Sequence, residues 1–318
     1  MKLKKIKRMV VAGTAILMTL SLAGCGIGSD SVKLGAAGVG GGYYAFSNAF
    51  AQIASSEDED LDFEVKATAG STANIRLLSD GYVDMAIAQA DLVDAAYNGT
   101  GATDKKRYRG YSEACQIVVR ADSGIDSLDD LQGKKISVGE EESGTQRNAE
   151  QILKMTGLVE SLVDTVNLDY VDAANELKSG QIDAFFCTAG IQTSVIEELS
   201  KECDVKLIGI DDKCRDRLKS VYGFYTDYTI PAGTYEGQTQ DVVTLGVRAV
   251  LLARDDMDEK IVEELTGLLF EHAQDIQYSI ALTFQIDESE AVKNVTIPFH
   301  DGAKAYYQKK GIEIPAEQ

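Results

Sequence analysis

Short apolar runs alternate with amphipathic stretches along the sequence from residue 32 onward. The runs have the length and composition of buried strands, and the stretches repeat apolar residues at helical spacing. We expect strands at 32–37, 63–67, 85–88, 115–120, 135–138, 166–170, 184–188 and 205–210. The helices expected between them include 43–55, 72–79, 144–156 and 173–179. This alternation predicts an α/β fold built from parallel βαβ units.

One pattern occurs twice, at 79–87 and at 178–186: a helix end, a glycine, a branched apolar residue, an aspartate and an apolar strand. The repetition favours two lobes of similar build, although glycine ends many unrelated helices. No low-complexity linker divides the chain, so we expect strands near 112–122 and 222–228 to cross between the lobes. The predicted division is lobe 1 at 32–118 plus 228–318, and lobe 2 at 119–227.

The amino terminus has the pattern of an export signal. Five basic residues are followed by an apolar run from Met9 to Ala23, which is shorter than the roughly 20 residues of a membrane-spanning helix. We therefore predict a signal peptide at residues 1–24, with an uncleaved membrane anchor as the alternative. The sequence from Leu22 to Cys25 resembles the lipobox of bacterial lipoproteins, in which Cys25 would carry acyl chains. Residues 25–31 would then tether the protein to the membrane outside the cytoplasm.

The chain is strongly acidic, with 31 basic and 51 acidic residues and a net charge of −20. That charge argues against nucleic acid or an anionic membrane surface as the main partner. Four cysteines follow the lipobox without any CxxC pair, so no metal site and no cofactor are predicted. Cys115 and Cys187 fall in apolar runs, whereas Cys203 and Cys214 flank a predicted strand and are candidates for a disulfide.

Three turns rich in glycine or hydroxyl groups each follow a predicted strand and open a predicted helix, at 38–44, 69–74 and 142–146. The amides and dipole of a helix N-terminus bind anions such as carboxylate. Taken singly, Ser71 and Ser143 are explained equally well as caps of their own helices. Three such turns together favour a cleft at the carboxyl ends of the strands. Residues that end strands at the same edge are Gln89, Asp91, Thr188 and Gly190.

Motifs of catalysis and nucleotide binding are missing from the sequence. The turn at 38–44 does not fit GxGxxG because Tyr43 stands where the last glycine belongs, and no GxxxxGK[ST] run exists. The two histidines, His272 and His300, do not neighbour a nucleophile motif such as GxSxG. We therefore predict a binding protein and no enzyme. A hydrolase or transferase that uses Ser143 is the alternative.

The order of the motifs resembles the TAXI group of extracytoplasmic receptors for tripartite ATP-independent periplasmic (TRAP) transporters. The segments that carry the resemblance are GVGGGYYAFSNAFA (38–51), ATAGSTANIRLLSDGYVDMAIAQAD (67–91), IVVRADSGIDSLDDLQGKKISVGEEESGTQRNAEQIL (117–153), LKSGQIDAFFCTAG (177–190) and IPFHDGAKAYYQKKG (297–311). The resemblance implies a type II periplasmic-binding-protein fold with two lobes that close on one solute. It also implies TRAP permease subunits as partners and glutamate, glutamine, 2-oxoglutarate or related acids as solutes.

The expected solute contacts combine the family's cleft segments with the turns above. They are Gly42, Tyr43, Tyr44, Ser71, Thr72, Asn74, Gln89, Asp91, Ser143, Gly144, Thr145 and Thr188. Helix N-termini at Ser71 and Ser143 would hold a carboxylate, and Asp91 or Glu142 would take an ammonium group if the solute is an amino acid. The acidic run 140–142 departs from relatives that are less charged there. A receptor of the same fold for an ABC importer or a sensor is the alternative to a TRAP receptor.

Overall fold

The structure is a computed structural model that describes residues 31–98, 112–159, 161–280, 286–292, 295 and 297–314. The chain divides into residues 1–30 and one compact unit from Ser31 to Gln318. The predicted signal peptide and Cys25 lie outside the described residues. Within the part that is described, no helix is both long and apolar enough to cross a membrane.

One ten-stranded sheet forms the centre of the unit, in the order β2-β1-β3-β10-β4-β7-β5-β6, with β8 paired to β4 and β9 to β10. The strands are β1 (Val32–Gly35), β2 (Phe63–Lys66), β3 (Met85–Gln89), β4 (Ser112–Arg120), β5 (Lys135–Ser137), β6 (Asp164–Val166), β7 (Ala184–Ala189), β8 (Val205–Leu207), β9 (Thr226–Ile230) and β10 (Val242–Ala253). β1 runs parallel to β2 and β3, and β5 runs parallel to β6 and β7. The predicted parallel βαβ units are thereby confirmed.

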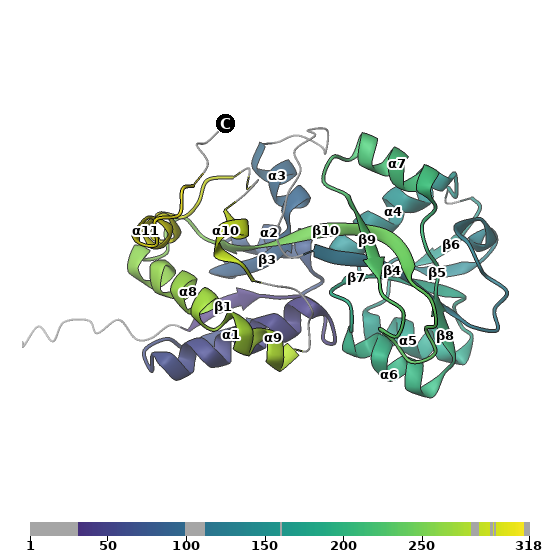
Figure 1. Cartoon of the computed structure of the whole chain (residues 1–318), viewed down its shortest axis with the longest axis horizontal. Helices are drawn as coiled ribbons and strands as arrows, with labels where there is room; N and C mark the ends of the chain where they lie inside the picture. Colours follow the sequence, from purple (N-terminus) through teal and green to yellow (C-terminus); the bar gives the residue numbers. More distant parts are fainter. Residues whose placement is uncertain are drawn as a thin grey trace, which may run out of the picture. The chain divides into compact units, whose positions relative to one another are not determined.

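The long strand β10 joins two halves of the sheet (Figure 1). Residues 249–253 pair antiparallel with β3, and residues 242–246 pair antiparallel with β9. We call β1 to β3 with the end of β10 the first half-sheet, and β4 to β9 with the beginning of β10 the second half-sheet. The sequence did not predict β10. The crossing strand expected near 222–228 overlaps β9, which pairs with residues 242–246 of β10. The exact lobe boundaries stay a prediction.

Helices cover both faces of each half-sheet (Figure 1). The helices are α1 (Gly42–Glu57), α2 (Ser71–Ser79), α3 (Ala90–Asn98), α4 (Gly144–Thr156), α5 (Tyr170–Ser179), α6 (Ser194–Glu202), α7 (Asp212–Val221), α8 (Glu259–Glu271), α9 (Ala273–Ile280), α10 (Glu288–Ala291) and α11 (Asp301–Lys309). On the first half-sheet, α1, α8 and α9 share an apolar core on one face, and α2 and α3 pack on the other. On the second, α4 and α7 lie on one face and α5 and α6 on the other.

The continuous apolar run in β4 is explained by burial on both faces. Val118 packs against α5 and α6 with Phe185, whereas its neighbour Val119 packs on the face of α4 with Ile152. Successive side chains of a strand point to opposite faces, so a strand buried on both sides has no polar alternation. This double burial fixes β4 between the helical layers and holds its first residues at the junction with the first half-sheet.

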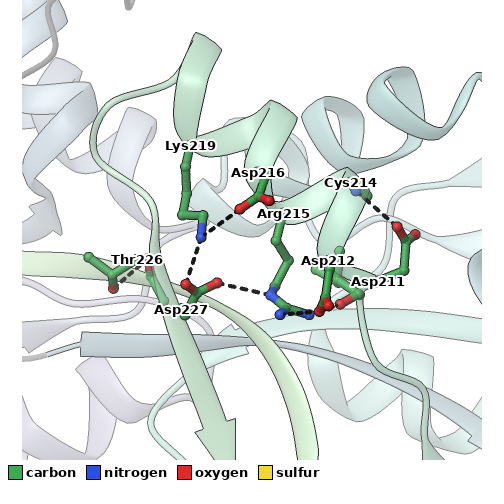
Figure 2. Close-up of polar contacts among 10 residues, drawn as sticks. Asp211, Asp212, Cys214, Arg215, Asp216, Lys219, Thr226 and Asp227 are labelled. Atoms are coloured by element: carbon green, nitrogen blue, oxygen red, sulfur yellow. Dashed lines mark hydrogen bonds and ion pairs between the residues drawn. The ribbon is translucent and has the colours of Figure 1, made fainter.

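A polar network ties α7 to the start of β9 (Figure 2). The Asp211 carboxylate caps α7 by accepting the amide of Cys214 at 2.9 Å. The Asp227 carboxylate receives Arg215 Nε at 2.9 Å and Lys219 Nζ at 2.6 Å. These cations hold the pKa of Asp227 below its usual range. The network anchors the segment through which the chain returns towards β10.

All four cysteines in the described residues are free thiols. The candidate disulfide between Cys203 and Cys214 is therefore not formed in this structure. Burial raises the pKa of the Cys214 thiol to about 11, so it stays protonated at neutral pH. The described part of the chain also holds no cluster of three or more His, Cys, Asp or Glu side chains suited to a metal ion.

Candidate functional site

A cavity of about 30 Å³ lies where the loops of the two half-sheets meet. Eight of the predicted solute contacts line it: Gly42, Tyr43, Ser71, Gln89, Ser143, Gly144, Thr145 and Thr188. The other four, Tyr44, Thr72, Asn74 and Asp91, are not among the residues that line it. The parallel strands carry their following loops to one edge of each half-sheet, and this brings turns distant in sequence together.

The N-termini of α1 and α4 face the cavity from opposite half-sheets. In α4, the hydroxyl of Ser143 caps the helix by accepting the amide of Gln146 at 2.9 Å. The next amide, that of Gly144, lies in the first turn, where amides have no acceptor within the helix. α1 begins at Gly42 after a tight turn in which the amide of Gly41 donates to the carbonyl of residue 38 at 3.1 Å. Both helices therefore direct partial positive charge at the cavity.

The N-terminus of α2 is occupied by the loop that precedes α4. The carbonyl of Glu142 accepts the amides of Thr72 at 3.1 Å and Ala73 at 3.2 Å. The Glu142 carboxylate receives Arg76 through Nη2 at 2.7 Å and Nε at 3.2 Å. Glu142 has a φ of 65°, which is unusual for a residue other than glycine. The α2 amides thus bind the protein's own carbonyl, and the partner of Arg76 is Glu142 rather than the neighbouring Asp80.

The two half-sheets touch directly beside the cavity. Gln89 Nε2 of β3 donates to Asn148 Oδ1 of α4 at 3.0 Å. A Cβ atom added to Gly144 would lie 2.5 Å from the Cδ atom of Gln89. On another side, Ser194 Oγ donates to the Gly40 carbonyl at 3.3 Å. The cavity of about 30 Å³ holds only a few water molecules, since each needs about 10–15 Å³. A larger solute can therefore enter only after the loops separate.

Hydroxyl groups of the second half-sheet hold the far wall of the cavity in place. Thr145 Oγ1 lies 2.6 Å from the Tyr170 hydroxyl and accepts the Thr188 amide at 3.2 Å. The Tyr170 hydroxyl donates to the Thr188 carbonyl at 3.1 Å. These bonds join α4, α5 and β7, so the Thr145 hydroxyl positions the wall as well as facing the cavity.

Three carboxyl groups that sequence reasoning missed line the cavity: Glu113, Glu140 and Asp169. Glu113 is only 2% exposed, and Tyr43 donates its hydroxyl to Glu113 Oε2 at 2.7 Å. Burial raises the pKa of Glu113 to about 8. Its signal in the sequence is a lone acid at the start of β4, two residues before the apolar run that marked the predicted strand.

Asp91 and Asn74 are buried behind the cavity wall. Burial raises the pKa of Asp91 to about 7, and the residue is 7% exposed. Asn74 is fully buried and donates to the carbonyls of Ala36 and Ile87, while its Oδ1 accepts from Thr68. In this conformation Asn74 connects α2 to the ends of β1 and β3. Direct contact of either residue with a solute stays a prediction.

Residues 34–311 match the model of the NMT1-like family. The chain belongs to the NMT1-like family.

Solved structures share the fold of this NMT1-like protein. A protein of Bordetella bronchiseptica RB50 is 16% identical with a TM-score of 0.50, and 91% of each chain is covered. A Listeria monocytogenes protein assigned as an L-cystine ABC transporter is 14% identical with a TM-score of 0.50, over 81% of this chain and 98% of that one. The alkanesulfonate-binding protein SsuA from Xanthomonas axonopodis pv. citri, bound to MOPS, is 15% identical with a TM-score of 0.48, over 88% and 91%. The NMT1-like protein has the mixed α/β type II periplasmic-binding-protein fold.

The two histidines of the NMT1-like protein lie away from the cavity lining. His272 ends α8, and its Nδ1 is 3.1 Å from Asp275. His300 begins α11, where its Nδ1 accepts the amide of Gly302 at 3.1 Å. Neither side chain contacts Ser143, so the geometry provides no histidine base for a serine nucleophile there.

Proposed function

We propose that the protein is an extracytoplasmic receptor that captures a small carboxylate solute between its two half-sheets and delivers it to a membrane transporter. The observation that carries this proposal is the cavity on a type II periplasmic-binding-protein fold, lined by the N-terminal turns of α1 and α4 from opposite half-sheets. Amide groups at such termini bind a carboxylate without a basic side chain. A solute that contacts both turns stabilises the closed arrangement by its differential affinity.

A TRAP permease is the proposed membrane partner. Support comes from the resemblance of the cleft segments to TAXI receptors, whose implied solutes are glutamate, glutamine, 2-oxoglutarate or related acids. The fold is shared with proteins assigned to ABC transport, so the fold itself is neutral between the two kinds of partner. Genes for a large fused permease beside this one would support the TRAP partnership, whereas a neighbouring nucleotide-binding subunit would overturn it.

We expect a thermal-shift screen to identify carboxylates that raise the melting temperature in a saturable manner. A ligand at 100 times its Kd stabilises the folded state by about 2.7 kcal/mol through mass action, which is a shift of several degrees. The screen should contain carboxylic acids, amino acids, sugars and phosphates at equal concentration. Stabilisation by sugars or phosphates alone would contradict the carboxylate assignment, and mass spectrometry of retained compounds would reveal a covalent product if the protein were an enzyme.

We also propose that acyl chains on Cys25 anchor the protein to the membrane. Replacement of Cys25 by Ala removes the acceptor at the cleavage point, so the Cys25→Ala variant should leave the membrane fraction or accumulate as the longer precursor. Fractionation with immunoblotting measures both outcomes, and Ser29→Ala in the same segment is the control. A mature-sized Cys25→Ala protein that stays with the membrane would exclude this anchor.

A further inference from the structure

The charges around the cavity do not suit a solute of net negative charge. Among the described residues that line it are the carboxyl groups of Glu113, Glu140 and Asp169, and no lysine, arginine or histidine. The α1 and α4 N-termini supply partial positive charge for one carboxylate. A second carboxylate on the solute would find no basic side chain among these lining residues, and burying a charge without a partner is costly.

Glu113 is the buried carboxyl group among the three that line the cavity. It is 2% exposed, stands at the start of β4, and receives the Tyr43 hydroxyl from α1 at 2.7 Å. Gln89 also hydrogen-bonds it, and the nearby charge that acts on it is the acid Asp91. Neither hydrogen bond supplies a full positive charge. Among the described residues, no cation acts on Glu113. A buried carboxylate without a cation is costly to ionise, so a cationic group of a solute would stabilise its ionised form.

A second acceptor beside Glu113 also lacks a donor. Gln89 is 2% exposed and lines the cavity, and its buried Oε1 has no hydrogen-bond partner among the described residues. Its Nε2 donates to Asn148 Oδ1 at 3.0 Å and also supplies the hydrogen bond to Glu113, so both Nε2 hydrogens have acceptors. Buried polar atoms are normally satisfied, and an orphaned one requires an explanation. A carboxylate and an amide oxygen that share one small cavity match the three donors of a protonated amine.

We propose that Glu113 and Gln89 bind a protonated amine of the solute, and that the preferred solutes carry such an amine and no net negative charge. This inference rests on the proposed receptor function and specifies the class of solute for the same cavity. The amine would lie against β3 and β4, with any carboxylate of the solute at the N-termini of α1 and α4. Deaminated acids would lose the charge pair and leave both acceptors unsatisfied.

The inference also predicts a dependence on pH. Burial raises the pKa of Glu113 to about 8, so most of the unliganded protein holds this carboxyl protonated at pH 7. An ammonium group binds the ionised form, which releases a proton, and affinity should therefore rise as pH increases from 6 to 8, by up to about tenfold per unit. Other titratable groups that face Glu113 are Tyr43 of α1, Asp91 of α3, Cys115 of β4, Tyr170 of α5 and Cys187 of β7. Burial keeps both thiols and the Tyr170 hydroxyl neutral in this range. The pKa of Asp91 is about 7, so Asp91 ionises over the same range, and its negative charge also favours a bound cation.

The test compares pairs of solutes that differ only by an amino group, with melting temperature and calorimetric affinity as readouts. The pairs are L-glutamine with glutaramate, γ-aminobutyrate with butyrate, and L-alanine with propionate. The amine member of at least one pair should bind at least tenfold more tightly than its partner. Glu113→Gln, which preserves shape, should remove this preference and reduce the affinity for the amine about 10- to 100-fold. Glu141→Gln makes the same charge change on an exposed neighbour and should leave both unchanged.

A second variant, Tyr43→Phe, keeps the carboxylate and removes its phenol donor. Because that hydrogen bond lowers the pKa of Glu113, the pH at which amine affinity reaches half its maximum should move upward. If deaminated acids bind as tightly as their amines, or if dicarboxylates such as 2-oxoglutarate bind most tightly, the inference on solute class is wrong while the receptor function stands. If no compound of the wider screen binds, both proposals fail.

Discussion

Replacing Gly144 with Ala should prevent closure of the two half-sheets and weaken solute binding roughly 5- to 150-fold. A Cβ at position 144 would lie 2.5 Å from both Cδ and Nε2 of Gln89, and the Gln89 side chain is buried and bonded to Asn148. Overpacking of this kind costs about 1–3 kcal/mol, which corresponds to that range in affinity. The helix itself should not suffer, because alanine has a higher helix propensity than glycine.

The measurement is the radius of gyration from small-angle scattering, with and without saturating solute, together with the Kd. Wild-type protein should become more compact with solute, and Gly144→Ala should not. A double variant, Gly144→Ala with Gln89→Ala, removes the clashing side chain and should recover compaction even where affinity stays low. Lys178→Ala is a matched control, since it removes only an ion pair to Glu202 within the second half-sheet, whose side chains are 46% and 61% exposed and which should contribute less than about 1 kcal/mol. Full compaction of Gly144→Ala would show that this contact does not limit closure.

The elements of the fold that local pattern determines could be predicted from the sequence. The helix α4 begins and ends where the pattern placed it, since Ser143 supplies the N-cap and Gly157 the left-handed residue that ends it. β10 was missed because its strand identity depends on partners far away in the chain: β3 on one side, and β4 and β9 on the other. Its apolar run gave no indication that one strand would serve both half-sheets.

The candidate site shows the same limit. Turns that open helices are local features, and residues from all three predicted turns line the cavity. Whether the amides of a helix N-terminus bind another part of the chain or stay available for a solute depends on tertiary contacts. The carbonyl of Glu142 occupies the α2 N-terminus only because the loop before α4 reaches across from the second half-sheet. Glu113 likewise becomes a cavity residue through Tyr43, which lies 70 positions away, and no pattern around residue 113 predicts that partner.

Replacement of Asn74 by Ala should lower the free energy of unfolding by about 3–5 kcal/mol, the range reached when a buried hydrogen-bond network is broken. Asn74 is fully buried, and its Nδ2 donates to the carbonyls of Gly35 at 3.3 Å and Ile87 at 2.7 Å, and to that of Ala36. Its Oδ1 accepts the Thr68 hydroxyl at 2.7 Å. Alanine would leave these buried groups without partners and would also open a small cavity.

Urea unfolding followed by circular dichroism measures this loss. Asn48→Ala is the matched control, because Asn48 is exposed on α1 and its side chain donates only to the Tyr44 carbonyl, at 2.7 Å. That control should change stability by no more than about 0.5 kcal/mol. A loss below about 1 kcal/mol for Asn74→Ala would mean that water or a shift of the strands satisfies the three carbonyls. Asn74 would then be available to a solute, as the sequence had suggested, because its amide would not be needed to hold β1 and β3 together.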